Sequence, residues 1–320
     1  MSGPRVLVIR LGSMGDVIHA LPAVASLKHS LPHSSITWMI DPKWSVLLEG
    51  NPYVDSALFF DRRVFAGFRH AWRQLRRPGF DFVVDFQGLI KSGVIASAAR
   101  AERIFGFNWA AAREPAASWF YSNRVPIRGY HAVERNLDLA AAAGAHSLLH
   151  TFPLPEGHPE GNLPTGPFVL ACPVAGWGAK QWPLEYYEAL AERLLSEFGT
   201  QLVINGPSAI SIRGAHTHVS GIPGLIHATR KASAIVGIDS GPLHLAAAME
   251  KPGVAIYGPT EPARHGPFGG TIAVLRSPTA STTYKRTSEP HASMRAISPE
   301  QVFEALEQVL EPHVKADKRT

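Results

Sequence analysis

Two glycine turns, each with an aspartate, are the parts of this sequence best suited to chemistry. The first spans Gly12–Asp16 (GSMGD) and the second spans Asp239–His244 (DSGPLH). Each follows a short apolar run and precedes a helical pattern, which predicts a strand, a tight turn and a helix. Glycine lets the backbone approach a ligand closely, and the unpaired N–H groups at the start of a helix attract an anion. Both turns are therefore candidate ligand sites.

The two aspartates also have structural interpretations, which the turns alone leave open. Asp16 lies where a helix would begin, and aspartate is a common helix N-cap. It could also be a functional carboxylate at the carboxyl edge of a parallel sheet, where α/β proteins bind ligands. Asp239 is placed to bind ribose hydroxyls or a base edge, while Ser240 and Gly241 present amides to an anion. Otherwise this turn is a second capped helix, with His244 as a core or cap histidine.

A third candidate is Lys180, in the loop Gly176–Pro183 (GWGAKQWP). A lysine in such a loop can neutralise a phosphate as a mobile point charge. Without further information, an ordinary surface lysine is the simpler interpretation. The turn Tyr257–Pro262 follows the next predicted strand and would border the same site as Asp239, although alone it indicates only a loop.

Residues 61–77 form the most basic segment of the chain. They contain six arginines and one aspartate, a charge of +5 in 17 residues, which equals the formal net charge of the whole protein. Aromatic and basic residues fall on separate helical stripes, a pattern typical of a helix that binds an anionic membrane surface or an anionic ligand. A core-packed helix with a solvated face is the alternative. No nucleic-acid-binding motif accompanies the segment, so we expect no nucleic acid partner.

Alternating strands and helices must position these residues. Strand-like runs at 5–11, 36–40, 57–60 and 80–86 are each followed by helical content, and the alternation resumes at 168–172, 201–204, 234–238 and 253–257. This order predicts an α/β protein with parallel sheets covered by helices on both faces. We expect domains over residues 1–155 and 167–298, a linker rich in proline and glycine over 156–166, a last helix over 299–312 and a tail over 313–320.

Composition excludes several classes of protein. A chain of 320 residues with 45% hydrophobic residues can fill two cores. Its single cysteine, Cys172, excludes a disulfide framework and a multi-cysteine metal site, and fits a reducing compartment. No apolar run approaches the roughly 18–20 residues that span a bilayer, and no signal-peptide core is present. We therefore expect a cytoplasmic protein, whose basic excess at only 18% charged residues indicates an anionic partner.

Six segments occur in an order that resembles one known family. They are Arg10–Pro22, Asp85–Ser92, Arg113–Tyr121, His131–Arg135, Lys180–Pro183 and Gly237–Leu245. This set resembles the bacterial ADP-heptose:lipopolysaccharide heptosyltransferases, family 9 of the glycosyltransferases, and residues 13–19 (SMGDVIH) are most similar to the type I enzymes. The resemblance covers nearly the whole chain. It implies the GT-B fold: two Rossmann-like domains facing across a cleft, an N-terminal one for the acceptor, a C-terminal one for the donor, and a last helix crossing back to the N-terminal domain.

The resemblance also assigns roles to individual residues. Asp16 corresponds to the general base of the family. The implied donor-binding residues are Gly12, Ser13, Gly15, Lys180, Asp239, Ser240, Gly241 and His244, and the implied acceptor-binding residues are Arg62, Arg63 and Arg113. One departure concerns residues 175–177 (AGW), where the family often has threonines, so donor phosphate contacts there must come from the backbone or from other residues. Residues 208–220 match no part of the family pattern.

The implied reaction is inverting transfer of L-glycero-D-manno-heptose from ADP-heptose to Kdo of the lipid A inner core, in lipopolysaccharide core biosynthesis. The enzyme would act on the cytoplasmic face of the inner membrane as a peripheral protein. Asp16 can act as the base if a closed cleft raises its pKa from about 4. Lys180 and the helix near Ser240 can offset the diphosphate charge. No Asp-x-Asp metal site is present, so we expect neither a metal nor another cofactor.

Two alternatives remain. The chain could be a sister glycosyltransferase that adds a second heptose or uses another glycan acceptor. It could also be a non-catalytic protein that binds a nucleotide sugar or a membrane surface, although the joint presence of Asp16, Lys180 and Asp239 argues against a dead site. An NAD-dependent dehydrogenase is disfavoured because neither half has GxGxxG followed by a ribose-binding acid.

Overall fold

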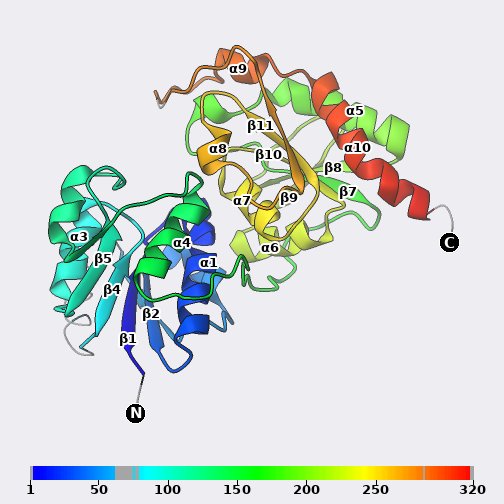
Figure 1. Ribbon diagram of the computed structural model, residues 1–320. Coiled ribbons are helices and arrows are strands. Elements are labelled where there is room, and N and C mark those ends of the chain that lie inside the picture. The colour runs from blue at the N-terminus through cyan, green and yellow to red at the C-terminus, as the bar shows by residue number, and fades with distance from the viewer. Residues whose placement is uncertain (1–2, 62–74, 76–78, 284, 318–320) are drawn as a thin grey trace. The chain divides into compact units, whose positions relative to one another are not determined.

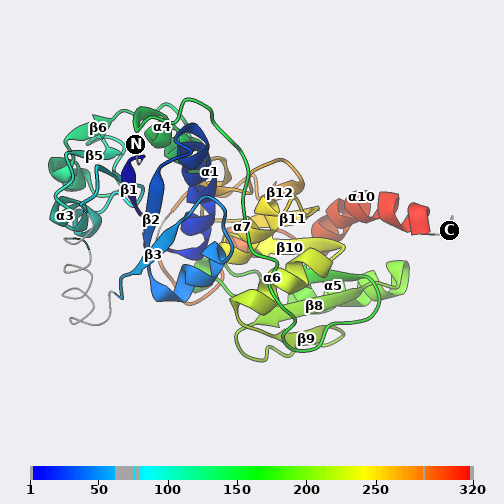
Figure 2. The same ribbon diagram turned by 90° about the horizontal axis from the view of Figure 1, so that it is seen from below.

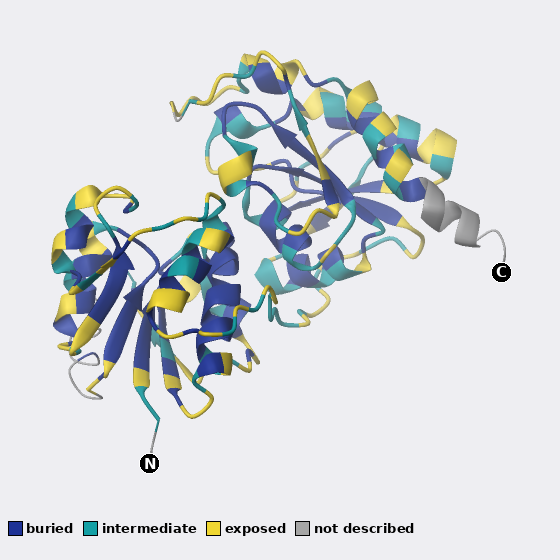
Figure 3. Ribbon diagram, viewed as in Figure 1, coloured by how far each residue is buried: buried dark blue, intermediate teal, exposed yellow. Residues whose placement is uncertain are grey.

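The computed structural model describes residues 3–61, 75, 79–283 and 285–317. The chain divides into two compact units, Met1–Pro155 and Glu156–Thr320, each built on a six-stranded parallel sheet (Figure 1). The predicted α/β class with parallel sheets is confirmed. The central strands of each sheet are buried on both faces, whereas the edge strands are partly exposed (Figure 3).

The sheet of the first unit has the order β3-β2-β1-β4-β5-β6. The chain therefore starts in the middle of the sheet and reverses its direction of winding beside β1, the position where open α/β sheets bind ligands. Val6, Leu7, Val8 and Ile9 of β1 are all fully buried, as expected for a strand covered on both faces. The strands are β1 (Arg5–Ile9), β2 (Ser35–Ile40), β3 (Ser56–Phe59), β4 (Phe82–Asp85), β5 (Arg103–Phe107) and β6 (Asn123–Val125).

Helices cover both faces of this sheet. Helices α1 (Met14–Ser30) and α4 (Ala132–Ala142) pack together on one face, and α3 (Ile90–Ala98) packs with the 3-10 helix η2 (Pro115–Phe120) on the other (Figures 1 and 2). A further 3-10 helix, η1 (Pro42–Leu48), follows β2. Because β1 lies at the centre, the turn between β1 and α1 emerges at the carboxyl edge beside the end of β4.

The second unit repeats this plan with the order β12-β11-β10-β7-β8-β9. Helix α5 packs with α10 on one face, where Trp182, Tyr187 and Phe303 fill the core. Helices α6 and α7 pack together beside β10. The strands are β7 (Phe168–Ala171), β8 (Gln201–Gly206), β9 (His216–Val219), β10 (Ala234–Ile238), β11 (Gly253–Tyr257) and β12 (Ile272–Arg276). The helices are η3 (Gly178–Lys180), α5 (Leu184–Phe198), α6 (Ile222–Lys231), α7 (Gly241–Ala248), α8 (Pro262–His265), α9 (Ala292–Arg295) and α10 (Pro299–Asp317).

Two segments with uncertain roles in the sequence are fixed to the second unit. Glu160, in the predicted linker 156–166, accepts hydrogen bonds from Gly221 N at 2.6 Å through its carboxylate and lies 2.6 Å from His218 Nε2 through its carbonyl oxygen. The linker is thus anchored along β9 and the start of α6. Residues 208–220, which match no family pattern, contain the edge strand β9 and the buried Ile212.

The end of the chain differs from the sequence prediction. The last helix continues past residue 312 to Asp317, so most of the predicted tail 313–320 is helical. Val302, Phe303 and Leu306 of this helix are buried in the core of the second unit, and the crossing of residues 299–312 back to the N-terminal domain stays a prediction. These apolar residues match the face that α5 and the sheet leave open, which explains why the helix packs there.

Candidate active site

The first part of the candidate site is the turn between β1 and α1. Gly12 adopts φ +145°, a conformation that residues with side chains rarely take, and a Cβ there would lie 2.5 Å from Trp44 Nε1. Both the backbone conformation and the lack of space for a Cβ therefore require glycine at this position. Ser13 is the N-cap of α1 and Gly15 is buried in its first turn, followed by Asp16. Asp16 is therefore not the helix N-cap that its structural interpretation proposed. It lies three residues after the N-cap, in the first turn of α1.

Both carboxylate oxygens of Asp16 have partners. Oδ2 accepts hydrogen bonds from Ser13 N at 2.8 Å and Ser13 Oγ at 3.1 Å. Oδ1 lies 2.5 Å from Arg10 Nη2, and Arg10 also donates through Nη1 to the carbonyl of Phe86 after β4. The Arg10 side chain is only 10% exposed. Sequence reasoning missed this arginine, although it stands at the start of the first family motif.

The environment of Asp16 corrects one expectation. From the sequence, the base role of Asp16 is conditional on a closed cleft that raises its pKa, whereas in this structure the pKa of Asp16 is lowered. Burial alone would raise it, but the Arg10 guanidinium, the hydrogen bonds from Ser13 and the charge of Arg113 together outweigh burial. Asp16 is therefore an ionised carboxylate at neutral pH, held in one orientation by a neighbouring cation.

Replacing Arg10 by glutamine is expected to raise the pKa of Asp16, because burial remains while the largest opposing charge is removed. Carboxyl ¹³C titration by NMR measures this directly, and the acid limb of the activity profile should move to higher pH with it. Arg113→Gln is the comparison, since its charge has a smaller effect on the pKa of Asp16. An unchanged pKa of Asp16 in Arg10→Gln would show that the ion pair does not control ionisation.

A buried hydrogen-bond network holds the loop after β4 against β1. Asp85 at the end of β4 accepts hydrogen bonds from Gln87 N at 2.8 Å and from Tyr121 Oη at 2.7 Å. Gln87 Oε1 in turn accepts a hydrogen bond from Leu11 N at 3.0 Å. Burial raises the pKa of Asp85 despite these donors. The motif Asp85–Ser92 therefore supports the Phe86 carbonyl that holds Arg10, a role that sequence reasoning had not assigned.

Tyr121→Phe is expected to lower the free energy of unfolding by about 1–3 kcal/mol, because it leaves a buried carboxylate oxygen without its hydroxyl donor. Urea unfolding measures this change. Tyr130→Phe removes a hydroxyl from a side chain that is 60% exposed and serves as the matched control. Equal effects of the two substitutions would refute a structural role for the Asp85–Tyr121 hydrogen bond.

The predicted acceptor arginines are only partly described. Within the basic segment 61–77 the structure describes only Asp61 and Leu75, which is 1% exposed, so Arg62 and Arg63 lie outside the described residues. Arg113 is described and exposed, and its positive charge contributes to the low pKa of Asp16. Of the three arginines, Arg113 is therefore the one whose charge is shown to act on Asp16, the candidate base.

The second part of the candidate site lies at the carboxyl edge of the other sheet. Lys180, at the end of η3, places Nζ 2.6 Å from Asp239 Oδ2, and His244 Nε2 lies 3.8 Å from Asp239 Oδ1. The Asp239 side chain, directly after β10, is 9% exposed. Burial alone would raise the pKa of Asp239, but the neighbouring His244 and the charge of Lys180 lower it overall. The structure thus brings Lys180 together with Asp239 and His244, which belong to a different sequence motif.

Two hydroxyls near this cluster lack partners among the described residues. Ser240 is the N-cap residue of α7, but its side chain makes no capping hydrogen bond and its Oγ is buried. Thr260 follows β11, is 4% exposed, and has an equally unpaired Oγ1. A buried hydroxyl without a partner is costly. With Gly241 opening α7, these groups are suited to contact a polar ligand at the sheet edge.

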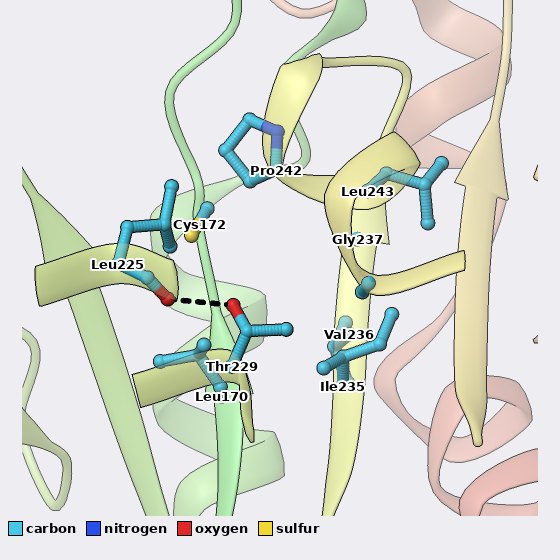
Figure 4. A pocket seen from close by; sticks show the side chains of 10 residues that line it. Leu170, Cys172, Leu225, Thr229, Ile235, Val236, Gly237, Pro242 and Leu243 are labelled. Atoms are coloured by element: carbon cyan, nitrogen blue, oxygen red, sulfur yellow. Dashed lines mark hydrogen bonds between the residues drawn. The ribbon is translucent and has the colours of Figure 1, made fainter. Parts of the chain in front are cut away.

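A separate pocket between α6, α7 and the sheet is not this site. Its lining is almost entirely apolar, and the one hydroxyl there, that of Thr229, donates to the carbonyl of Leu225 at 2.8 Å (Figure 4). Neither Lys180 nor Asp239 lines it. Across the described residues, no group of histidine, cysteine and acidic side chains is arranged to hold a metal ion, and no helix is long and apolar enough to cross a membrane.

Comparisons with known proteins support the family resemblance. The family model for glycosyltransferase family 9 (heptosyltransferase) matches residues 68–293. Lipopolysaccharide heptosyltransferase 1 of Escherichia coli K12 is 30% identical over 307 residues, covering 86% of this chain and 94% of that protein. Lipopolysaccharide heptosyltransferase 2 of Salmonella typhimurium is 31% identical over 167 residues, covering 45% of this chain and 47% of that protein. The structure of E. coli heptosyltransferase WaaC with ADP superposes with a TM-score of 0.77 at 24% identity, covering 95% of this chain and 99% of that one.

Proposed function

This chain belongs to glycosyltransferase family 9, the heptosyltransferases, and from that premise we propose that it transfers heptose from ADP-heptose to Kdo of the lipid A inner core. The fold is GT-B. The observation that carries the proposal is the pair of charged clusters, Arg10 with Asp16 and Lys180 with Asp239, at the carboxyl edges of the two sheets. A type 1 enzyme is favoured over type 2 because the type 1 relative matches almost twice as much of the chain.

In the proposed reaction Asp16 takes the proton from the attacking acceptor hydroxyl. The carboxylate is ionised and oriented by Arg10 and Ser13 before substrate arrives, so no side-chain rearrangement is needed to present it. Because the contacts with Arg10 and Ser13 lower the pKa of Asp16, this carboxylate is a weak base. Catalysis then depends more on the position of the carboxylate relative to the acceptor hydroxyl than on its basicity. Attack from the face opposite the ADP group inverts the configuration at the heptose anomeric carbon, without a covalent intermediate.

Stabilisation of the leaving ADP falls to the second unit. Lys180 supplies a positive charge at the sheet edge, and the N-terminus of α7 supplies backbone N–H groups and a positive dipole end. Ser240 and Thr260 add hydroxyl donors that have no partner among the described protein groups. Such preorganised donors stabilise the charge that develops on the diphosphate. We propose that these groups serve this purpose without a metal ion.

The acceptor side rests on the first unit. Arg113, exposed near Asp16, is suited to bind the phosphate or carboxylate groups of a lipid A–Kdo acceptor. The basic segment 61–77 would add attraction to an anionic membrane surface, with the protein peripheral on the cytoplasmic face of the inner membrane. Arg62 and Arg63 belong to that segment and carry the same proposed role.

A coupled assay of ADP release tests the proposed function. Purified protein is given ADP-heptose with Kdo-lipid A, and in parallel with an acceptor that already carries one heptose. Faster turnover with Kdo-lipid A supports the type 1 activity. Turnover confined to the heptosylated acceptor would identify a sister enzyme, and ADP-heptose binding without turnover on either would identify a binding protein.

A further inference from the structure

Trp177 holds two cations beside the donor cluster of the second unit. Lys180 Nζ lies 4.8 Å from the centroid of the Trp177 ring, and the guanidinium carbon of Arg286 lies 5.4 Å from the same ring. Both distances are within the roughly 6 Å range of a cation–π interaction. Trp177 therefore links the lysine already assigned to the donor diphosphate with an arginine from a distant loop.

Main-chain contacts fix the position of that loop. Ala179 N donates to Thr287 O at 3.2 Å, and His291 N donates to Ala179 O at 3.2 Å. Gly178 packs so tightly against Ser288 that a Cβ on Gly178 would lie 1.7 Å from the Ser288 carbonyl oxygen. The loop that carries Arg286 is thus hydrogen-bonded to the loop that carries Lys180 through both the N–H and the carbonyl group of Ala179.

The charges at this site call for a further cation. Lys180 is already paired with the Asp239 carboxylate at 2.6 Å, so much of its charge is balanced before a ligand arrives. A nucleoside diphosphate brings negative charge on both phosphates. Arg286 is exposed, and no carboxylate among the described residues lies within ion-pair distance of it. The loop before Lys180 cannot supply hydroxyl donors either, since its residues are Ala175 and Gly176.

We infer that Arg286 binds the diphosphate of the nucleotide-sugar donor and that Trp177 positions Arg286 and Lys180 together for this purpose. The inference rests on the proposed function, because it takes a nucleoside diphosphate as the ligand of this edge. Arginine suits the role, since its planar guanidinium can donate two parallel hydrogen bonds to phosphate oxygens. Trp177 thus holds two cations beside residues 175–177, which have no hydroxyl groups to donate to a phosphate.

Calorimetric titration of the full chain with ADP tests the role of Arg286. Arg286→Gln is expected to weaken ADP binding about tenfold, which corresponds to about 1.4 kcal/mol. Lys285→Gln is the matched control, because it removes the same charge from the neighbouring position of the same loop, and its affinity should stay within about twofold of the wild type. Affinity of Arg286→Gln within about twofold of the wild type, or equal weakening by Lys285→Gln, would overturn the inference. Failure of the wild-type chain to bind ADP would instead contradict the proposed function.

The positioning role of Trp177 has a test of its own. Trp177→Leu should raise the KM for the nucleotide sugar about tenfold or more with a smaller change in kcat, because both cations lose their common support. Trp177→Phe keeps an aromatic face and should recover most of the lost affinity. Equal effects of leucine and phenylalanine would show that the ring only fills space, and would overturn the positioning role.

Discussion

Replacing Asp16 by alanine is expected to lower the rate of heptose transfer by about 10²–10⁴-fold, the usual contribution of a positioned general base. Binding of ADP should stay within about twofold of the wild type, because Asp16 belongs to the first unit and the donor cluster to the second. Single-turnover transfer and calorimetry on the same protein sample measure the two quantities. Near-normal transfer by Asp16→Ala would refute the assignment of the base.

Asp55→Asn provides the control for this experiment. Asp55 is also an ionised carboxylate with a lowered pKa, paired with Lys28 at 2.8 Å, and it accepts a hydrogen bond from Ile36 N at the start of β2. It therefore lies at the amino edge of the sheet, opposite the candidate site. Its replacement should affect stability modestly and leave turnover unchanged. A comparable loss of turnover in Asp55→Asn would mean that removal of any ion-paired carboxylate damages the enzyme.

Lys180→Ala is the second substitution with a large expected effect. It removes a cation from the diphosphate site and leaves the buried Asp239 carboxylate, 9% exposed, without its lysine partner. The remaining negative charge then repels the donor, so both ADP affinity and kcat should fall, the latter by about 10²–10³-fold. Steady-state kinetics with varied ADP-heptose separates the two effects.

A double variant distinguishes lost catalysis from lost folding. Lys180→Ala combined with Asp239→Asn removes the charge that the single substitution strands, so thermal stability should recover relative to Lys180→Ala alone. Turnover should not recover, because the diphosphate still lacks its lysine. Recovery of turnover together with stability would show that Lys180 serves the fold and does not act on the donor.

The sequence predicted those features that depend on local pattern. The β1 turn and Asp16, and the β10 turn with Asp239 and Ser240, are each encoded within a few residues, so their strands, turns and helices could be located without a structure. The convergence of Lys180 and Asp239 came from the family resemblance, because about 60 residues separate them and no periodicity links them. Parallel strands then bring their carboxyl ends to one edge, as the fold confirms.

Features that depend on distant contacts could not be predicted. Arg10 lies only six residues from Asp16, but its other hydrogen bond goes to the carbonyl of Phe86, a partner 76 residues away that could not be identified from the sequence. The same holds for Asp85 with Tyr121 and for Trp177 with Arg286. The packing of the last helix is a property of the same kind, because its helical pattern alone does not indicate that Phe303 lies in the core of the second unit.

The anomeric configuration of the heptose attached to Kdo tests the central claim most directly. The wild-type chain is incubated with ADP-heptose and Kdo-lipid A, and the C1–H1 coupling of the isolated product is measured by NMR. A single base at Asp16, with ADP stabilised by Lys180 and no covalent intermediate, predicts that C1 of the product has the configuration opposite to that of the donor. Retained configuration at C1, or a product without heptose, would contradict the account.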